Sequence, residues 1–273
     1  MHPYVVADVF TSQPLKGNPV AVFTAGQDVP AELMQAVARE MNLSETVFVL
    51  PSTVADVKVR IFTPAMELPF AGHPVLGTAH ILAQSSGADT VRLETGKGVV
   101  PVTFTNGLGR MSQPVPTWRE FAEAGELLAA IGVRYSVLPV DVYDNGARHL
   151  YVMLDNFDAV ANLHPNLSVL ASLPQMGVSC FAGSDNRWKT RMFGPSLGVP
   201  EDPATGSAAG PLAVHLARHG KIGYGQEIEI SQGIELGRPS TLYARVEGSG
   251  GTVTAVEVAG SAVIVAHGQL DLP

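Results

Sequence analysis

Three side chains of this sequence could transfer protons: Glu45, His73 and Asp202. Two of them lie in runs of small residues, and the third lies at the start of an apolar run. His73 lies within "ELPFAGHPVLGTA" (67–79) and Asp202 within "EDPATGSAAG" (201–210). Glu45 ends "NLSE" and enters the apolar run "TVFV". We expect partial desolvation there to raise the pKa of Glu45, which makes it a competent acid as well as a base. These residue types suit acid–base catalysis.

The two glycine-rich runs open predicted helices and suit an anion site. The first turn of a helix has unpaired N–H groups and a partial positive charge, so it can hold a carboxylate. Gly72 in the first run, and Gly206 with Ser207 in the second, let a ligand approach the backbone without a Cβ in the way. Two such turns facing across a cleft would grip a small carboxylate. The alternative is that the small residues only allow close helix packing.

Each proton-moving candidate also has a structural alternative. Glu45 could be solvated at a strand entrance, His73 could bond its own loop, and Asp202 could complement a helix dipole. Arg60 and Arg191 occupy equivalent places in two similar segments. They fit either substrate-anion binding or a structural role.

Other reactive residues give weaker signals. His215 and His219 have the spacing that lets two imidazoles share a metal, but no third ligand is evident, so we predict no metal site. Cys180, the only cysteine, lies in an apolar stretch that favours the core over catalysis. The chain lacks a G-x-S-x-G elbow, a P-loop and a G-x-G-x-x-G after a strand, which are the signals of hydrolases and nucleotide-binding proteins.

The elements that must position these groups occur twice in the chain. The ordered matches are "VADVF…GNPVAVF" (6–23) with "VDVYDNGARHLYVML" (140–154), "RIFTPAMELP" (60–69) with "RMFGPSLGVP" (191–200), and more weakly "LETGKG" (93–98) with "ISQGIELG" (230–237). Similar offsets in the same order predict a duplicated domain.

Strands and helices mix without a βαβ rhythm, so the predicted class is α+β. One helix is predicted over 30–43, with Pro30 in its first turn, and another in "GSAAGPLAVHLARHG", ended by Gly220. The predicted domains are 1–115 and 116–260, joined near "SQPVPTW".

Composition narrows the possible partners. The chain has 273 residues, 46% of them hydrophobic, which is enough to fill a substantial core. Its net charge of −8 would repel nucleic acid and anionic membranes. The N-terminus lacks a basic signal-peptide region, and no apolar run is long enough to span a membrane. We therefore expect a soluble cytoplasmic protein with neither nucleic-acid nor membrane partners.

These motifs together resemble the PhzF family, cofactor-free isomerases of phenazine biosynthesis built on the diaminopimelate epimerase fold. The segments that carry the resemblance run over nearly the whole chain: "GNPVAVF", "REMNLSETVFV", "RIFTPAMELPFAGHPVLGTA", "QPVPTW", "RMFGPSLGVPEDPATGSAAGPLAVHLARHG" and "QGIELGRPS". The resemblance implies two pseudo-symmetric domains, each a curved, mostly antiparallel sheet around a central helix, with the active site in the cleft between them. It also implies a homodimer, and a final strand, about 261–273, that returns to the first domain.

The resemblance further implies an activity, namely isomerisation of trans-2,3-dihydro-3-hydroxyanthranilate to an amino-ketone without a cofactor. The roles that it implies are proton shuttle for Glu45, catalytic pocket residues for His73 and Asp202, and substrate binding for Gly72, Gly206, Ser207 and Asn18.

The chain departs from the amino-acid epimerases that share this fold. Those enzymes use one cysteine from each glycine-rich loop, whereas Ala71 and the Asp202–Pro203 pair stand there in this chain, which excludes two-cysteine racemisation. Two alternatives stay open: a PhzF-like isomerase or epimerase of another small carboxylate, and a ligand-binding protein that has kept the fold without the chemistry.

Overall fold

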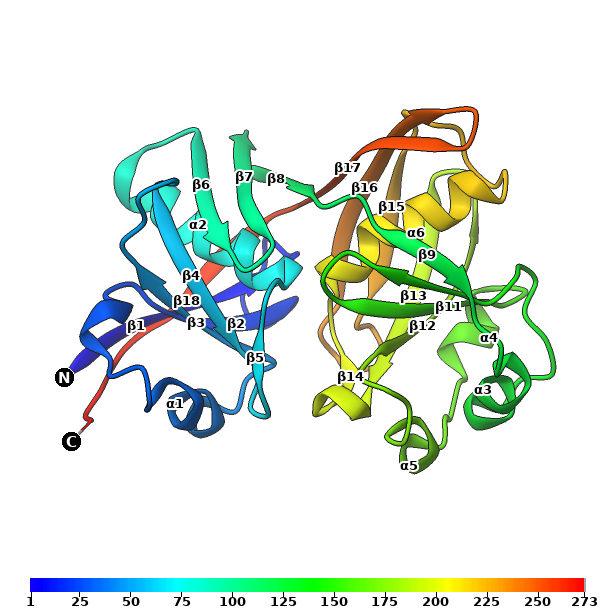
Figure 1. Ribbon diagram of the computed structural model, residues 1–273, viewed down its shortest axis with the longest axis horizontal. Helices are drawn as coiled ribbons and strands as arrows, with labels where there is room; N and C mark the ends of the chain where they lie inside the picture. The colour runs from blue at the N-terminus through cyan, green and yellow to red at the C-terminus, as the bar shows by residue number, and fades with distance from the viewer. Residues whose placement is uncertain (273) are drawn as a thin grey trace. The chain divides into compact units, whose positions relative to one another are not determined.

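The computed structural model describes residues 1–272, which divide into two compact units. Unit 1 comprises Met1–Ser112 and the C-terminal segment from Ala259, and unit 2 comprises Gln113–Val258. In unit 1, strand β1 (His2–Val9) pairs antiparallel with strand β18 (Ala262–Leu270), drawn blue and red in Figure 1. Both ends of the described chain therefore belong to the same unit.

The remaining elements of unit 1 alternate strands with short helices. They are β2 (Asn18–Phe23), the 3-10 helix η1 (Gly26–Asp28), α1 (Met34–Met41), β3 (Glu45–Leu50), β4 (Val57–Phe62), β5 (Glu67–Leu68), α2 (Gly72–Ser86), β6 (Thr90–Thr95), β7 (Gly98–Thr105) and β8 (Leu108–Gln113), which ends at the unit boundary.

Unit 2 has a similar succession of elements. They are β9 (Thr117–Glu120), α3 (Ala124–Ile131), β10 (Asp141–Asp144), β11 (Arg148–Met153), α4 (Phe157–Ala161), α5 (Leu167–Leu170), β12 (Gly177–Ser184), β13 (Arg187–Gly194), the 3-10 helix η2 (Pro195–Leu197), β14 (Val199–Asp202), α6 (Gly206–Arg218), β15 (Glu227–Gln232), β16 (Ser240–Ser249) and β17 (Thr252–Gly260).

Strand pairing confirms the duplication that the sequence predicts. In unit 1, β1 pairs antiparallel with β2, β2 parallel with β3, β3 antiparallel with β4, β4 parallel with β6, and β6 antiparallel with β7. Unit 2 repeats this pattern with β10, β11, β12, β13, β15 and β16. The class is α+β, as predicted, and each unit is one copy of the same mixed sheet.

One helix in each unit is buried on every side. All residues of α2 from Gly72 to Ala79 are buried, as are all residues of α6 from Gly206 to Leu216. A helix that is apolar or small all round belongs inside a core. The close approach of the sheet requires small residues on the helix: a Cβ on Gly77 would lie 2.7 Å from Val9 Cγ2. Part of each small-residue run therefore serves packing.

The structure corrects one helix start and confirms one helix end. The predicted helix at 30–43 begins only at Met34, because Pro30 lies in a preceding turn in which Leu33 N–H bonds its carbonyl. Helix α6 ends as predicted, with Gly220 at φ +66° just beyond its C-cap, a conformation that glycine adopts without strain.

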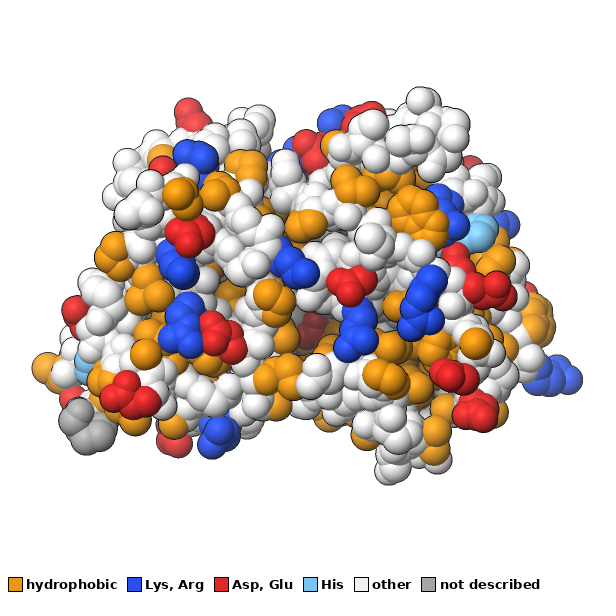
Figure 2. All heavy atoms as spheres, in the orientation of Figure 1, with side chains coloured by type: hydrophobic (Ala, Val, Ile, Leu, Met, Phe, Trp, Pro, Cys, Tyr) orange, Lys and Arg blue, Asp and Glu red, His pale blue; other side chains and the backbone are white. Residues whose placement is uncertain are grey.

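Neither the helices of the described residues nor the face drawn in Figure 2 is strongly apolar. Within residues 1–272, none of the helices combines the length and apolar character that crossing a membrane requires. On the face drawn in Figure 2, basic and acidic side chains are interspersed, and hydrophobic side chains are scattered among them.

Candidate functional site

Glu45 is the first residue of β3 and lies at the parallel pairing of β3 with β2. Its backbone is opposite Val20. The side chain is only 13% exposed, so the strand entrance is not a solvated position. That finding disfavours the solvated alternative for Glu45. The raised pKa that the sequence predicts for this carboxyl stays a prediction.

His73, the second residue of α2, lies against Glu45. Its Nε2 is 3.2 Å from Glu45 Oε2, although the two groups are not aligned as a hydrogen bond. Burial lowers the pKa of His73 to about 3, and a contact with the backbone of Pro19 opposes this only in part. The imidazole is therefore neutral at pH 7.

Asn18 completes this group through a contact with His73. Its Nδ2 lies 3.2 Å from His73 Nδ1, and its side chain is fully buried. A proton on Nε2 would let Nδ1 accept from the Asn18 amide, whereas a proton on Nδ1 would be donated to the Pro19 carbonyl. Unit 1 thus brings together Glu45, His73 and Asn18, as a carboxyl group beside a neutral imidazole.

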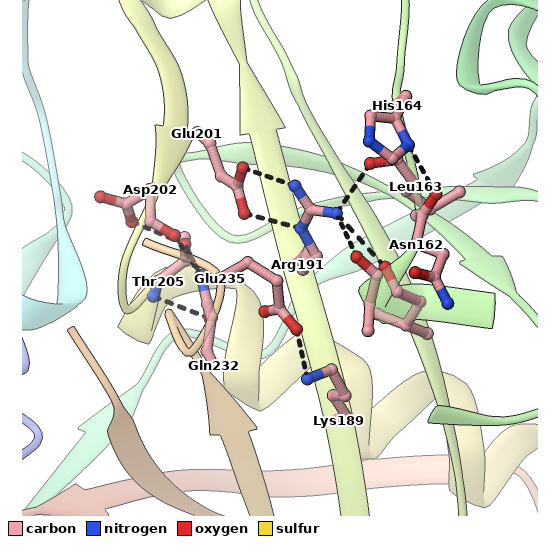
Figure 3. A network of polar contacts seen from close by, with 12 residues as sticks. Asn162, Leu163, His164, Lys189, Arg191, Glu201, Asp202, Thr205, Gln232 and Glu235 are labelled. Atoms are coloured by element: carbon pink, nitrogen blue, oxygen red, sulfur yellow. Dashed lines mark hydrogen bonds and ion pairs between the residues drawn. The ribbon is translucent and has the colours of Figure 1, made fainter. Parts of the chain in front are cut away.

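In unit 2, Asp202 is held by a network that the sequence did not indicate (Figure 3). Thr205 Oγ1 donates to Asp202 Oδ2 at 2.6 Å. Gln232 Nε2 donates to the Asp202 carbonyl at 2.8 Å and to Thr205 Oγ1 at 2.9 Å, while its Oε1 accepts from Thr205 N–H. Asp202 is buried and has a fixed orientation.

In each unit, a turn that contains a glycine packs against the loop that precedes the buried helix. A Cβ on Gly96 would lie 3.0 Å from Pro69 Cα in unit 1. In unit 2, Gly233 has φ +76°, and a Cβ there would lie 2.5 Å from the Pro203 carbonyl. These two glycines belong to the matching segments 93–98 and 230–237. In both units, the missing side chain lets the turn approach the loop closely.

The first turns of α2 and α6 suit the binding of an anion. Neither helix has a side chain capping its N-terminus. Gly72 and Gly206 do not have positive φ, so backbone conformation does not require glycine there. The absence of a side chain at these positions fits close approach by a ligand or by packed neighbours. Ser207 follows Gly206, and its hydroxyl lies 3.0 Å from His149 Nε2.

The two equivalent arginines are structural. Arg60 makes a bidentate pair with Glu67, and Arg191 makes one with Glu201. Each guanidinium also lies over a phenylalanine ring two residues further along its strand, at 5.0 Å and 4.9 Å. Both arginines therefore have carboxylate partners within their own unit, which favours the structural alternative over substrate binding.

The lone cysteine belongs to the core. Cys180 is fully buried in the apolar cluster of unit 2, and burial raises the pKa of its thiol to about 12. A thiol with that pKa supplies almost no thiolate at neutral pH. The prediction of a core cysteine agrees with these findings.

The histidine pair of α6 does have a third neighbour, which corrects the sequence prediction on that point. Asp141 Oδ2 lies 3.7 Å from His215 Nδ1 and 3.2 Å from His219 Nε2. Arg218 Nη1 is 3.1 Å from the same oxygen. Burial favours the neutral carboxyl of Asp141, but bonds to the two histidines and to Arg218 outweigh it and lower its pKa to about 2. A guanidinium already neutralises this carboxylate, so the group is an ion-pair network.

Sequence reasoning missed Thr205, Gln232 and His149. Thr205 stands inside the quoted "EDPATGS" run, so its neighbourhood was visible even though its bond to Asp202 was not. Gln232 and His149 are separated from their partners by 30 and 58 residues. Only the fold brings those side chains together.

Two of the buried histidines, His73 and His149, predict acid sensitivity. Burial lowers the pKa of His149 to about 4, as it lowers that of His73 to about 3. In the unfolded chain both should titrate near 6.5. Because the unfolded state binds more protons below that pH, the free energy of unfolding should fall as pH drops from 6.5 toward 4, by up to about 1.4 kcal/mol per pH unit from each histidine.

Urea unfolding at a series of pH values measures this effect. The His149→Gln variant lacks one of the two groups, so its stability should fall less steeply than that of the wild type in the same window. Equal slopes for the two proteins would contradict the assignment of a neutral, buried His149.

Comparisons with known proteins identify the family of this chain. Residues 7–268 match the family model PhzC-PhzF, described as phenazine biosynthesis-like protein. The trans-2,3-dihydro-3-hydroxyanthranilate isomerase of Pseudomonas aeruginosa is 53% identical over 98% of this chain and 99% of its own. The crystal structure of a Bacillus anthracis phenazine biosynthesis protein of the PhzF family superposes with a TM-score of 0.87 at 26% identity, covering 99% of both chains. A hydroxyproline epimerase from Agrobacterium vitis, at 12% identity and a TM-score of 0.67, shares the fold.

Proposed function

We propose a function that proceeds from one fact: this chain belongs to the PhzC-PhzF family of phenazine biosynthesis-like proteins. The proposed reaction is the isomerisation of trans-2,3-dihydro-3-hydroxyanthranilate to an amino-ketone. It is supported by the name of a relative that is 53% identical over almost its full length. The observation on this chain that carries the proposal is the contact of Glu45 with neutral His73 in unit 1.

Glu45 is the proposed base and then the proposed acid. Its carboxylate takes the proton from C3 as the C3–H bond breaks, and the electron pair of that bond enters the conjugated system. The same carboxyl group then delivers a proton to C1, which forms the new C1–H bond and restores the carboxylate. This transfer moves one hydrogen and shifts the double bonds, which gives the enol of the amino-ketone. The enol O–H proton then moves to C4 as the C3=O bond forms, so atoms and electrons balance within the substrate.

His73 supports the ionised form of Glu45 before the first transfer. Its Nε2 lies 3.2 Å from Glu45 Oε2, so a proton on that nitrogen would lie beside the carboxylate. A neutral donor suits this task, since it stabilises the base without holding it as a permanent ion pair. The negative charge that develops on the substrate requires other donors.

Unit 2 supplies the proposed donors for that charge and for the carboxylate of the substrate. The uncapped first turn of α6 presents backbone N–H groups beginning at Gly206, with the Ser207 hydroxyl next to them. The network of Thr205 and Gln232 holds Asp202 in a single orientation. In unit 1, the uncapped first turn of α2 offers similar backbone donors at Gly72.

The test is turnover of a substrate panel by the purified protein. Trans-2,3-dihydro-3-hydroxyanthranilate should disappear rapidly, and cyclic and open-chain amino acids should be unchanged. Rapid turnover of another small carboxylate, with none of the dihydro compound, would assign the chain to a different isomerase or epimerase. Binding of the dihydro compound without its consumption in D₂O, and without deuterium uptake, would instead indicate a binding protein.

A further inference from the structure

We infer that His149 is a positioning residue for the Ser207 hydroxyl, directing the hydroxyl proton toward the substrate carboxylate. In this arrangement His149 donates its Nε2–H to Ser207 Oγ, and Ser207 donates its own O–H to the carboxylate. The inference rests on the proposed function, because that function places a carboxylate at the first turn of α6.

The contact is buried and specific. His149, on β11, is 2% exposed, and Ser207, the second residue of α6, is 6% exposed. His149 Nε2 lies 3.0 Å from Ser207 Oγ, and this is the hydrogen bond that the Ser207 side chain makes within residues 1–272. The oxygen therefore has one fixed partner on the protein side.

A proline in the helix ties the backbone of Ser207 to the same hairpin. Pro211 has no N–H, so it cannot give the Ser207 carbonyl its usual helical hydrogen bond. Asn145 Nδ2 donates to that carbonyl at 3.0 Å instead. Asn145 lies in the turn between β10 and β11, and His149 lies on β11. The hairpin thus holds both the carbonyl and the hydroxyl of Ser207.

The direction of the hydrogen bond follows from the protonation of His149. Burial lowers its pKa, so at pH 7 the ring carries one proton. Nδ1 is buried and has no hydrogen-bond partner within residues 1–272. A proton on Nδ1 would be a buried N–H without an acceptor, which folded proteins rarely contain. With the proton on Nε2, the ring donates to Ser207, and the serine proton is left for a ligand.

The two units contact the second residue of the buried helix from different strand positions. In unit 1, Asn18 on β2 contacts His73 of α2, whereas in unit 2, His149 on β11, which aligns with Val20, contacts Ser207 of α6. Glu45 begins β3 in unit 1, and Gly177 begins β12 in unit 2, each at the pairing with the preceding strand.

Gly177 leaves unit 2 without a carboxyl group at this equivalent position. A Cβ on Gly177 would lie 2.9 Å from His149 Nδ1, so a larger side chain there would displace the ring. Unit 1 has retained a proton-transfer group at the strand start, whereas unit 2 has a hydroxyl oriented by histidine. This difference between the units fits a role for Ser207 in binding the substrate, and it does not fit a second proton-transfer group in unit 2.

Binding of anthranilate, a stable aromatic carboxylate, tests the inference without turnover. Isothermal titration calorimetry of the full chain should show that Ser207→Ala and His149→Phe each weaken anthranilate binding by about tenfold or more. Ser207→Ala removes the hydrogen bond to the carboxylate, and His149→Phe removes the donor that orients the serine hydroxyl. His149→Gln should bind within about threefold of the wild type, because a glutamine amide can place a donor near the former Nε2. Aniline, which lacks the carboxylate, should not distinguish the variants.

A double-mutant cycle separates positioning from general damage to the fold. In the Ser207→Ala background, His149→Phe should weaken binding by less than about twofold, because the hydroxyl it orients is already gone. Equal losses in both backgrounds, a glutamine variant no better than phenylalanine, or no anthranilate binding by the wild type would each overturn the inference. If His149→Phe does not fold, His149→Asn, whose amide is too short to reach Ser207, replaces it. None of these results depends on whether Glu45 is the catalytic base.

Discussion

Replacement of Glu45 by Gln should lower kcat for trans-2,3-dihydro-3-hydroxyanthranilate by about two to four orders of magnitude. Glutamine keeps the size of the side chain, and its amide oxygen can still lie beside His73, but it cannot accept and return a proton. KM should change little, because the proposed contacts to the substrate carboxylate come from other residues. Steady-state kinetics that follow substrate loss measure both quantities.

Glu67→Gln is the matched control for this experiment. Glu67 is in the same unit, its side chain is 44% exposed, and it pairs with Arg60. The same chemical change there should leave kcat within about twofold of the wild type. Native turnover by Glu45→Gln would remove Glu45 from the proposed mechanism, and an equal loss in both variants would indicate a general effect on the fold.

Arg191→Met should be strongly destabilising, by about 3–5 kcal/mol in the free energy of unfolding. Arg191 donates through Nε and Nη2 to Glu201, and through Nη1 to the carbonyls of Val160, Ala161 and Leu163 (Figure 3). The side chains of Arg191 and Glu201 are only 9% and 13% exposed. Removal of the arginine leaves a buried carboxylate and these carbonyls without their donor.

Arg60→Met provides the comparison, because duplication has placed the same pair in two environments. Arg60 and Glu67 are 28% and 44% exposed, so water screens their attraction, and the loss should be below about 1 kcal/mol. Urea unfolding of both variants tests the difference. Similar small losses would show that the Arg191 pair does not stabilise unit 2 as we describe.

Arg191→Met should also lower the rate of substrate turnover per folded molecule. Glu201 immediately precedes Asp202 on β14, so the arginine helps to fix the strand that carries the proposed site residue. Substrate turnover at a temperature well below the unfolding transition separates this effect from loss of folded protein.

The sequence predicted the features that repeat along the chain. Matching segments around Arg60 and Arg191 predicted the duplicated fold because both copies keep the same strand, proline and glycine order. Gly220 predicted a helix end because a left-handed glycine commonly follows the last turn of a helix. These signals are local, so one sequence is enough to read them.

Contacts between distant residues could not be predicted in the same way. Asp141 lies 78 residues before His219, and nothing in "HLARH" indicates that a carboxylate and Arg218 will meet there. Gln232 and Asp202 meet only because β15 pairs with β13. The start of α1 was misplaced because Pro30 fits a turn as well as a helix start, and local preference does not distinguish the two.

Transfer of deuterium within the substrate tests most directly the claim that one carboxyl group performs both proton transfers. Trans-2,3-dihydro-3-hydroxyanthranilate labelled with deuterium at C3 would be converted in H₂O in a single turnover, and the product analysed by mass spectrometry. We predict that a measurable fraction of the product carries the deuterium at C1, since Glu45 returns the hydrogen that it removed. A product free of deuterium at C1, together with complete labelling of that carbon when unlabelled substrate reacts in D₂O, would contradict direct return of the C3 hydrogen by Glu45.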